Sequence, residues 1–214
     1  EMQRSLVGSE MCIRDRFYVA RHGQTLLNAL GRAQGWCDSP LTTEGEDAAA
    51  GLGSLLSTVP LHAAYASDTM RAVQTARICL EAAGQGSCSV IEDSRLREWC
   101  LGSMEAESND VFSRRVSEWI GPPDSLDDMN RRLPEVAEAL RAHDETRTAE
   151  PFQSIANRAM AFLKDAAELH GSDSNVLVVT HAFLIKTMLF IIEPERLDVL
   201  GKIGNGSFVK LYIE

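Results

Sequence analysis

The stretch FYVARHGQTLLN, from Phe17 to Asn28, decides how the rest of the chain is interpreted. Its first four residues are apolar or aromatic, as expected of a strand that is buried on both faces of a parallel sheet. Arg21, His22 and Gly23 then end the apolar run. Ligands of open α/β sheets bind at the carboxyl ends of the strands. The guanidinium of Arg21 suits a phosphate there, and a ring nitrogen of His22 can attack phosphorus.

A second buried strand ends in the same way. The run NVLVVT at 175–180 is the clearest buried strand in the sequence, and His181 follows it directly. If the two strands are parallel neighbours, His22 and His181 lie at one edge of the sheet. Taken alone, an Arg-His-Gly motif also fits a polar strand end, and a lone histidine also fits a helix cap. The repeated placement favours a shared site.

Arg71 is a third candidate for that edge. A short apolar strand at 63–66 precedes it, and Ser67-Asp68 is expected to cap a helix over 69–83. Arg71 lies in the first turn of this helix, from which its side chain can reach back over the carboxyl edge of the sheet. An exposed helix arginine paired with an acidic side chain is the alternative.

Glu98 is the fourth candidate. It lies in a loop after a third strand, next to Leu96 and Trp99. Partial burial among such neighbours would raise its pKa and keep a proton available near neutrality. Arg95 and Arg97 would instead favour its ionised form, so the sequence leaves its protonation open. A solvated loop carboxylate is the alternative.

The alternation of strands and helices predicts an α/β fold, a three-layer α/β/α sandwich with a mostly parallel central sheet. The expected strands lie at 17–20, 63–66, from 90 onwards, 175–180 and 207–213, and the expected helices at 43–57, 69–83, 154–170 and 183–192. The segment 102–153 is polar, acidic and rich in arginine. We expect it to form a small helical insertion over the sheet edge rather than a domain of its own.

Composition narrows the class of partner. The formal net charge of -10 argues against a nucleic-acid partner, although a few converging arginines can still bind an anionic substrate. No apolar run approaches the length of a membrane-spanning helix, so no membrane partner is expected. The five cysteines form no C-x-x-C pair and no metal-finger spacing with the five histidines, which favours a reducing, cytoplasmic setting.

Residues 1–16 stand apart from this pattern. The segment MCIRDR at 11–16 resembles the translation of an adapter used in sequencing libraries. We therefore expect a non-native or disordered tail over 1–16 and one domain over 17–214.

Four blocks of the sequence resemble the histidine phosphatase superfamily, in its phosphoglycerate-mutase-like branch. In chain order they are RHGQTLLN at 21–28 with QGWCDSPLT at 34–42, SDTMRAVQTA at 67–76, LREWCLGSMEAES at 96–108 and VVTHAFLIKTML at 178–189. Arg-His-Gly alone is a weak signal, but the four blocks in series are specific and cover nearly everything from Phe17 onwards. The resemblance implies a phosphoglycerate-mutase-like fold.

The resemblance also implies a role for each candidate residue. His22 matches the nucleophile that becomes phosphohistidine, and Glu98 matches the proton donor to the leaving oxygen. The other positions that match phosphate or substrate contacts are Arg21, Asn28, Gln34, Gly35, Arg71, His181 and Ala182. Two departures concern substrate fit, because Ala182 and Ala106 stand where the family usually has glycine.

The implied chemistry needs no metal and no other cofactor. To attack phosphorus, His22 must be unprotonated on one ring nitrogen, so we expect the other nitrogen to donate to a backbone carbonyl. Arg21 and Arg71 can clamp phosphate oxygens bidentately. No Walker-type loop or carboxylate cluster in the sequence indicates a magnesium site.

We therefore expect a metal-independent phosphatase that hydrolyses phosphomonoesters of small metabolites. A phosphoglycerate mutase is the first alternative, but such mutases usually follow the catalytic glutamate with Arg-His-Tyr-Gly, and here Glu98 is followed by Trp99-Cys100-Leu101-Gly102. A non-catalytic phospholigand-binding protein is the second alternative. The physiological substrate and the oligomeric state stay open. Candidate substrate contacts in the insertion, which also fit the solvated faces of short helices, are Arg114, Arg115, Trp119, Arg131 and Arg132.

Overall fold

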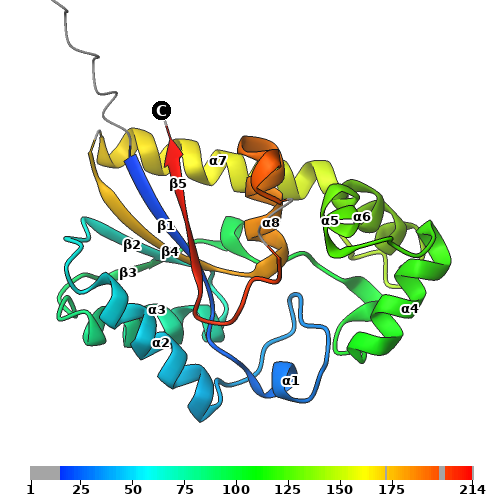
Figure 1. Ribbon diagram of the computed structural model, residues 1–214, viewed down its shortest axis with the longest axis horizontal. Coiled ribbons are helices and arrows are strands. Elements are labelled where there is room, and N and C mark those ends of the chain that lie inside the picture. The colour runs from blue at the N-terminus through cyan, green and yellow to red at the C-terminus, as the bar shows by residue number, and fades with distance from the viewer. Residues whose placement is uncertain (1–14, 172, 198–200, 214) are drawn as a thin grey trace, which may run out of the picture.

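A five-stranded sheet forms the centre of the protein (Figure 1). The computed structural model describes residues 15–171, 173–197 and 201–213, so most of the expected tail, residues 1–14, lies outside the described residues. The sheet order is β3-β2-β4-β1-β5, and all neighbouring pairs are parallel except β1 and β5. The strands are β1 (Asp15–Arg21), β2 (Ala63–Ala66), β3 (Val90–Glu92), β4 (Asn175–Thr180) and β5 (Phe208–Ile213). The mostly parallel sheet was predicted, and β1 and β4 are adjacent inner strands.

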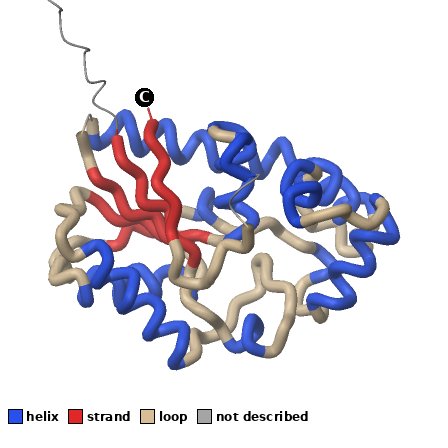
Figure 2. Tube along the Cα trace, viewed as in Figure 1, coloured by secondary structure: helices blue, strands red, loops and turns tan. Residues whose placement is uncertain are grey.

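Helices cover both faces of this sheet (Figure 2). The helices are α1 (Leu26–Ala29), α2 (Thr43–Leu56), α3 (Met70–Ala82), α4 (Asn109–Ile120), α5 (Leu126–Arg131), α6 (Leu133–Ala142), α7 (Phe152–His170) and α8 (Ala182–Ile192). Helices α2 and α3 pack on one face, and α7 and α8 pack on the other. The three-layer α/β/α sandwich predicted from the sequence is therefore confirmed.

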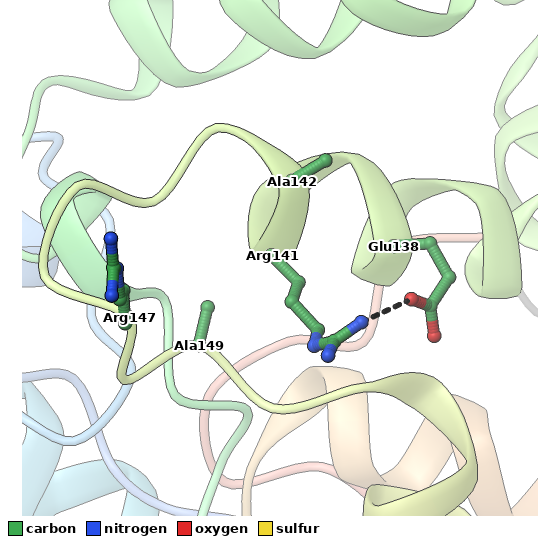
Figure 3. Close-up of a pocket in the computed structure, with 5 residues that line it drawn as sticks. All are labelled: Glu138, Arg141, Ala142, Arg147 and Ala149. Atoms are coloured by element: carbon green, nitrogen blue, oxygen red, sulfur yellow. Dashed lines mark ion pairs between the residues drawn. The ribbon is translucent and has the colours of Figure 1, made fainter.

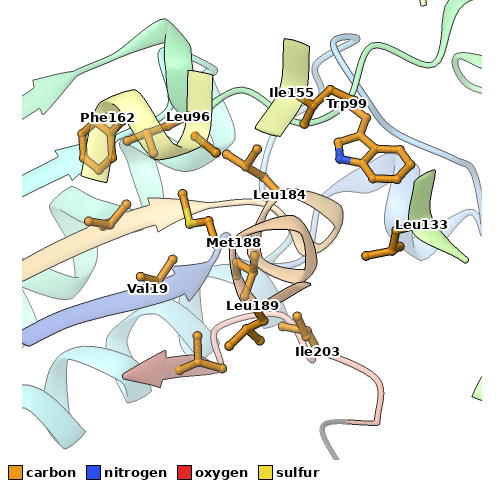
Figure 4. Close-up of a cluster of buried hydrophobic side chains, with 14 of the residues drawn as sticks. Val19, Leu96, Trp99, Leu133, Ile155, Phe162, Leu184, Met188, Leu189 and Ile203 are labelled. Carbon is orange, nitrogen blue, oxygen red and sulfur yellow. The ribbon is translucent and has the colours of Figure 1, made fainter. Parts of the chain in front are cut away.

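The alternation of side chains along β1 explains the two layers. Phe17 and Val19 belong to the buried cluster that contains α7 and α8 (Figure 4), whereas Tyr18 and Ala20 belong to the cluster that contains α2 and α3. Successive side chains of a strand point to opposite faces, so an unbroken apolar run can serve two cores at once. The run must end where the strand leaves both cores, and it ends at Arg21.

Two helix starts show where local sequence decides the structure and where it does not. Helix α2 begins as predicted, because the side chain of Thr42 accepts from the backbone N–H of Gly45. Helix α3 does not begin with the predicted Ser67-Asp68 cap. Its N-cap residue is Thr69, without a side-chain cap bond, and the N–H of Met70 donates to the distant carboxylate of Asp38 at 2.6 Å. The carboxylate of Asp68 binds Arg97 instead, so it is not available as a cap.

Helices α4 to α6 form the insertion. Val116 of α4 and Leu133 and Leu140 of α6 belong to the same buried cluster as the sheet residues Phe17 and Val178. The insertion therefore shares its core with the rest of the protein. A charged hollow of about 450 Å³ lies on α6 and the loop after it (Figure 3) and is lined by Glu138, Arg141, Ala142, Arg147 and Ala149.

Candidate active site

Two histidines meet at the carboxyl edge of the sheet. β1 and β4 are paired so that their last residues, Arg21 and Thr180, lie opposite each other. His22 and His181 follow directly after the two strands. The ring centroids of these histidines are 5.1 Å apart, and both side chains are buried. The predicted meeting of the two imidazoles is confirmed, because the strands that carry them are parallel neighbours.

His22 has the tautomer that a nucleophile needs. Its Nδ1 lies 2.7 Å from the carbonyl oxygen of Gly23. A carbonyl oxygen can only accept, so the proton of the neutral ring is on Nδ1 and the lone pair is on Nε2. Burial lowers the pKa of His22 well below its ordinary value, and the nearby cations of Arg71 and Arg21 lower the pKa further. The ring is therefore neutral around pH 7, as the sequence analysis required.

His181 has the opposite tautomer. The guanidinium of Arg71 donates from Nη2 to the Nδ1 of His181 over 3.1 Å. Because arginine has no acceptor, Nδ1 carries the lone pair and Nε2 carries the proton. Burial and the charge of Arg71 lower the pKa of His181 well below its ordinary value. His181 is thus a neutral donor next to a neutral acceptor, His22.

Arg71 is not the free fork that the sequence analysis expected. Its side chain is fully buried, and its Nη1 donates to the carbonyl oxygen of Cys37 and to the carboxylate of Asp38. Its Nη2 donates to the carbonyl oxygen of Gly35 at 2.6 Å and to His181. Four bonds to the protein leave Nε as the atom that can still bind a ligand, so a bidentate phosphate clamp by Arg71 is not present. The loop that occupies the fork lies more than thirty residues away in sequence, which no local pattern reveals.

Three buried nitrogen donors in this cluster have no acceptor among the described residues. They are Arg21 Nε, Arg71 Nε and His181 Nε2. The other unpartnered buried side-chain atoms of the described residues, on Gln74 and Asn130, are acceptors. Buried polar groups are normally hydrogen-bonded, because leaving one unpaired costs about 1–3 kcal/mol. Three unpaired donors around a neutral imidazole therefore indicate a site for an anion with several oxygens.

Glu98 lies beside these donors and caps a helix. Its carboxylate accepts backbone N–H bonds of 3.0 Å from Trp99 and from Phe183 and Leu184 in the first turn of α8. Burial raises the pKa of Glu98, while the backbone donors and the arginine charges at Arg71 and Arg21 oppose that rise. The net direction is upward, which favours a carboxyl group that can carry a proton.

Arg95 and Arg97, which could have kept Glu98 ionised, are paired with other acidic side chains. Arg95 forms salt bridges with Asp93 and Asp165, and Arg97 binds the carboxylate of Asp68 through two nitrogens. Because their charges are paired away from the carboxyl group of Glu98, they do not hold it ionised, and burial dominates its pKa.

Asn28, Gln34 and Gly35 support the cluster indirectly. Asn205 donates both to the carbonyl oxygen of His22 and to the side chain of Asn28, which links Asn28 to His22. Gln34 bonds to Thr25, Asn28 and Ser39 rather than to the histidines or arginines. Gly35 contributes its carbonyl oxygen to Arg71. A Cβ at Gly35 would lie 2.3 Å from the carboxylate of Glu105, so no larger residue fits this position.

Comparison with known families decides the assignment. Residues 17–214 match the family model of the histidine phosphatase superfamily (branch 1). The chain belongs to the histidine phosphatase superfamily, a superfamily of enzymes. The neutral histidine after β1 and the donors beside it therefore lie in a histidine phosphatase superfamily member.

Relatives within this superfamily carry the name of a mutase. A protein named "probable phosphoglycerate mutase GpmB" from Enterobacter sp. is 34% identical over 176 residues, which cover 80% of this chain and 74% of the relative. The protein of the same name from Klebsiella pneumoniae is 38% identical over 130 residues, which cover 58% of this chain and 59% of the relative. The match thus spans less than two thirds of the length of the Klebsiella protein.

Solved structures share the fold. Phosphoglycerate mutase from Bacillus anthracis superposes with a TM-score of 0.84 at 32% identity, covering 94% of this chain and 88% of that one. A mycobacterial glucosyl-3-phosphoglycerate phosphatase, solved with VO3, superposes with a TM-score of 0.70 at 24% identity, covering 92% of this chain and 90% of that one. At that identity the second likeness concerns the fold alone.

The two positions where the superfamily pattern has glycine differ in their backbone. Ala182 begins helix α8, where alanine is a favourable residue. Ala106 has a φ of 60°, in the left-handed region that costs a residue with a Cβ about 1–2 kcal/mol. The backbone bonds of Ala106 to Ala33 and to the side chain of Arg32 hold it in this conformation.

We expect Ala106→Gly to stabilise the protein. The change removes the left-handed strain but adds disorder to the unfolded chain, so the free energy of unfolding should rise by about 0.5–1 kcal/mol. Ala50→Gly, in the middle of α2, is the matched control and should lower that free energy by about 1 kcal/mol. Urea unfolding of both variants measures the difference. A loss of stability in Ala106→Gly would show that the strain is not present.

Glu105 organises the loop that holds Arg71, a role that the sequence did not reveal. Its carboxylate accepts four backbone N–H bonds, from Gly35, Trp36, Cys37 and Leu101. The same loop presents the carbonyl oxygens of Gly35 and Cys37 to Arg71. Glu105 therefore fixes Arg71, and through it His181. The sequence showed Glu105 only as a motif position, because its partners are backbone groups.

Arg158 organises the backbone of Glu98 in a comparable way. Its guanidinium forms a bidentate pair with Glu150 and also donates to the carbonyl oxygens of Arg95, Arg97 and Glu98. These bonds join α7 to the loop that carries Glu98. Nothing in the local sequence distinguishes Arg158 from an ordinary exposed helix arginine.

The arginines of the insertion favour the ordinary interpretation. Arg114 and Arg115 pair with Glu118 on their own helix, and Arg132 pairs with Asp128 and Glu135. The ring of Trp119 stacks on His143 with centroids 4.4 Å apart. These side chains have partners within the insertion, so the structure gives no reason to assign them to substrate.

Proposed function

We propose that this protein is a metal-independent phosphatase that hydrolyses phosphomonoesters of small metabolites through a phosphohistidine intermediate on His22. The observation that carries the proposal is the set of donors on Arg21, Arg71 and His181, unpaired among the described residues, beside a neutral His22. The Nδ1 of His22 is bound to Gly23, and its Nε2 has no hydrogen-bond partner in the same part of the chain. A phosphoryl group supplies both the electrophile for that nitrogen and the oxygens for those donors.

The reaction would proceed in two steps. In the first, Nε2 of His22 bonds to phosphorus, the bond from phosphorus to the leaving oxygen breaks, and Glu98 gives that oxygen its proton. In the second, a water oxygen bonds to phosphorus, Glu98 takes a proton from the water, and the bond to His22 breaks. The donors on Arg21, Arg71 and His181 stabilise the charge on the phosphoryl oxygens in both transition states. Free phosphate leaves, and both residues return to their starting states.

The mutase is kept as the second candidate because relatives in the superfamily carry that name. A mutase must retain a doubly phosphorylated intermediate, which calls for further charged donors beside the acid. Here the side chains of Trp99, Cys100 and Leu101, directly after Glu98, are buried and uncharged. This supports the phosphatase. A non-catalytic phospholigand-binding protein is the weakest candidate, since the loss of His22, Glu98 or His181 would favour it and the sequence contains all three.

The phosphatase and the mutase differ in what they release. We expect incubation with 3-phosphoglycerate to yield free phosphate, with little 2-phosphoglycerate and no stimulation by 2,3-bisphosphoglycerate. Both products are followed in one assay. Rapid isomerisation that depends on the bisphosphate, with little free phosphate, would promote the mutase.

The expectation of metal independence is tested with a chelator. Within the described ranges, His, Cys, Asp and Glu form no group of three or more that could hold a metal ion. We expect turnover of a panel of phosphorylated metabolites to be unchanged by EDTA.

None of the helices in the described part is long and apolar enough to span a membrane. Cys37, Cys79, Cys88 and Cys100 are free thiols, which supports the proposed cytoplasmic setting.

A further inference from the structure

Lys186 is a buried cation next to the proposed site. It lies on helix α8, whose first turn follows His181 and binds the carboxylate of Glu98. Its side chain is nine-tenths buried, at 9% exposure. Among the described residues Lys186 has no salt bridge, whereas the exposed Lys164 pairs with Glu168 one turn away.

The ammonium group lies near the first turn of α8. Helical side chains lean toward the amino terminus of their helix. The Nζ atom of Lys186 accordingly lies 5.9 Å from the ring centroid of Phe183, one turn earlier. That turn donates to Glu98. The pKa of Lys186 is lowered, mainly by burial; the charge of Glu98 raises it, and that of Arg21 lowers it further. Glu98 and Arg21 both belong to the proposed active site.

A buried lysine without a counterion is unusual. Lysine is almost never fully buried unless it is paired, because its charge loses the stabilisation of water. Glu98 does not serve as a permanent counterion. It already accepts three backbone bonds, and in the proposed reaction it alternates between its neutral and ionised forms. The missing counterion can come from the substrate.

We propose that Lys186 binds a second anionic group of the substrate, a carboxylate or a second phosphate, beside the phosphoryl group that is transferred. This inference rests on the proposed function and narrows it, because it selects small phosphomonoesters with a second negative charge. The selection comes from this chain's own lysine on α8. Arg114, Arg115 and Arg132 of the insertion are paired with acidic side chains and are not part of this inference.

The test compares ligands that differ by one anionic group. 3-Phosphoglycerate is paired with glycerol 3-phosphate, and fructose 1,6-bisphosphate with fructose 6-phosphate, so the two pairs distinguish a carboxylate from a second phosphate. Each ligand competes with p-nitrophenyl phosphate, and the competition constant is measured. In the wild-type enzyme the more charged member of at least one pair should bind at least about tenfold more tightly than the less charged member, as expected for hydrogen bonds to a charged group.

Three variants make the result specific. We compare the ratio of the two competition constants within the pair that shows the preference. In Lys186→Met this ratio should fall toward one, and in Lys186→Arg it should be largely kept. Lys164→Met removes the same charge from an exposed position of α7 and should leave the ratio unchanged. Thermal unfolding checks that each variant is folded. A ratio near one in the wild-type enzyme, or a wild-type ratio in Lys186→Met, overturns the proposal.

Failure of the proposed function would look different. In that case the wild-type protein does not turn over p-nitrophenyl phosphate at all. The same ratios are then measured by calorimetry, which needs no turnover, and they decide the role of Lys186 by the same criteria.

Discussion

Replacing His22 with alanine is expected to abolish phosphatase activity and the covalent intermediate together. The Nε2 of His22 is the nucleophile in the proposed reaction. Burial and the charges of Arg71 and Arg21 keep the ring neutral by lowering its pKa, and the bond from Nδ1 to Gly23 fixes the tautomer. Removal of a covalent nucleophile costs about 10⁶-fold in kcat in well-studied hydrolases. His22→Ala should therefore show only background hydrolysis of any phosphomonoester.

The intermediate is measured directly. Turnover of a ³²P-labelled substrate, quenched in denaturant, should leave a label on the wild-type protein that is labile in acid and stable in base. The label should be absent from His22→Ala. The control is His143→Ala, because this exposed imidazole lies in the insertion against Trp119. A label on serine, or turnover that survives in His22→Ala, would refute the assignment of His22 as the nucleophile.

The second large effect is expected for Glu98→Gln. The amide cannot supply the proton that the leaving oxygen needs, so hydrolysis of alkyl phosphates should slow by about 10²–10⁴-fold. An activated aryl phosphate needs little protonation on leaving, so its loss should be much smaller. The amide also replaces one of the two acceptor oxygens that cap α8, and we expect a loss of about 1 kcal/mol in stability.

The pH profile separates the chemical from the structural part of that effect. Burial raises the pKa of Glu98, and the first step requires its protonated form. Activity toward alkyl phosphates should therefore decrease as the pH rises through that pKa, and Glu98→Gln should lack this decrease. Equal losses for aryl and alkyl phosphates, with an unchanged pH profile, would mean that Glu98 acts only as a helix cap.

The parts of this protein that the sequence predicted are those with a local pattern. The apolar runs before His22 and His181 fix two buried strands, and a polar residue after each run fixes the edge at which they meet. The helix expected at 43–57 is α2, which Thr42 caps and whose first turn carries the acidic residues Glu44 and Glu46. Such features depend on neighbours in sequence, so they can be read without the fold.

The parts that the sequence did not predict depend on distant partners. Asp38 caps α3 from more than thirty residues away, and Glu105 binds three backbone N–H groups of a loop that precedes it by about seventy residues. Arg71 was recognised as a site residue, but its fork was assigned to phosphate although Gly35, Cys37 and Asp38 occupy it. No residue type marks these contacts in advance, because most of them use backbone atoms.

The limit between tail and domain is a further example. The expected tail covered residues 1–16, whereas β1 begins at Asp15, so residues 15 and 16 belong to the sheet. Arg16 pairs in register with Asn175 of β4 and Tyr212 of β5. Backbone pairing accepts any side chain at a strand end, so the resemblance of a segment to foreign sequence does not exclude it from a sheet.

The adjacency of β1 and β4 also sets when the site can exist during synthesis. Arg16 and Asn175 are partners in the sheet but are separated by 159 residues of chain (Figure 1). At about 5–20 residues per second, the ribosome needs roughly 10–30 s to make that interval. Throughout this time β1, which precedes His22, lacks its neighbouring strand β4, which precedes His181. The proposed site is therefore incomplete in a growing chain, and the proposed activity becomes possible only after β4 and His181 have been made.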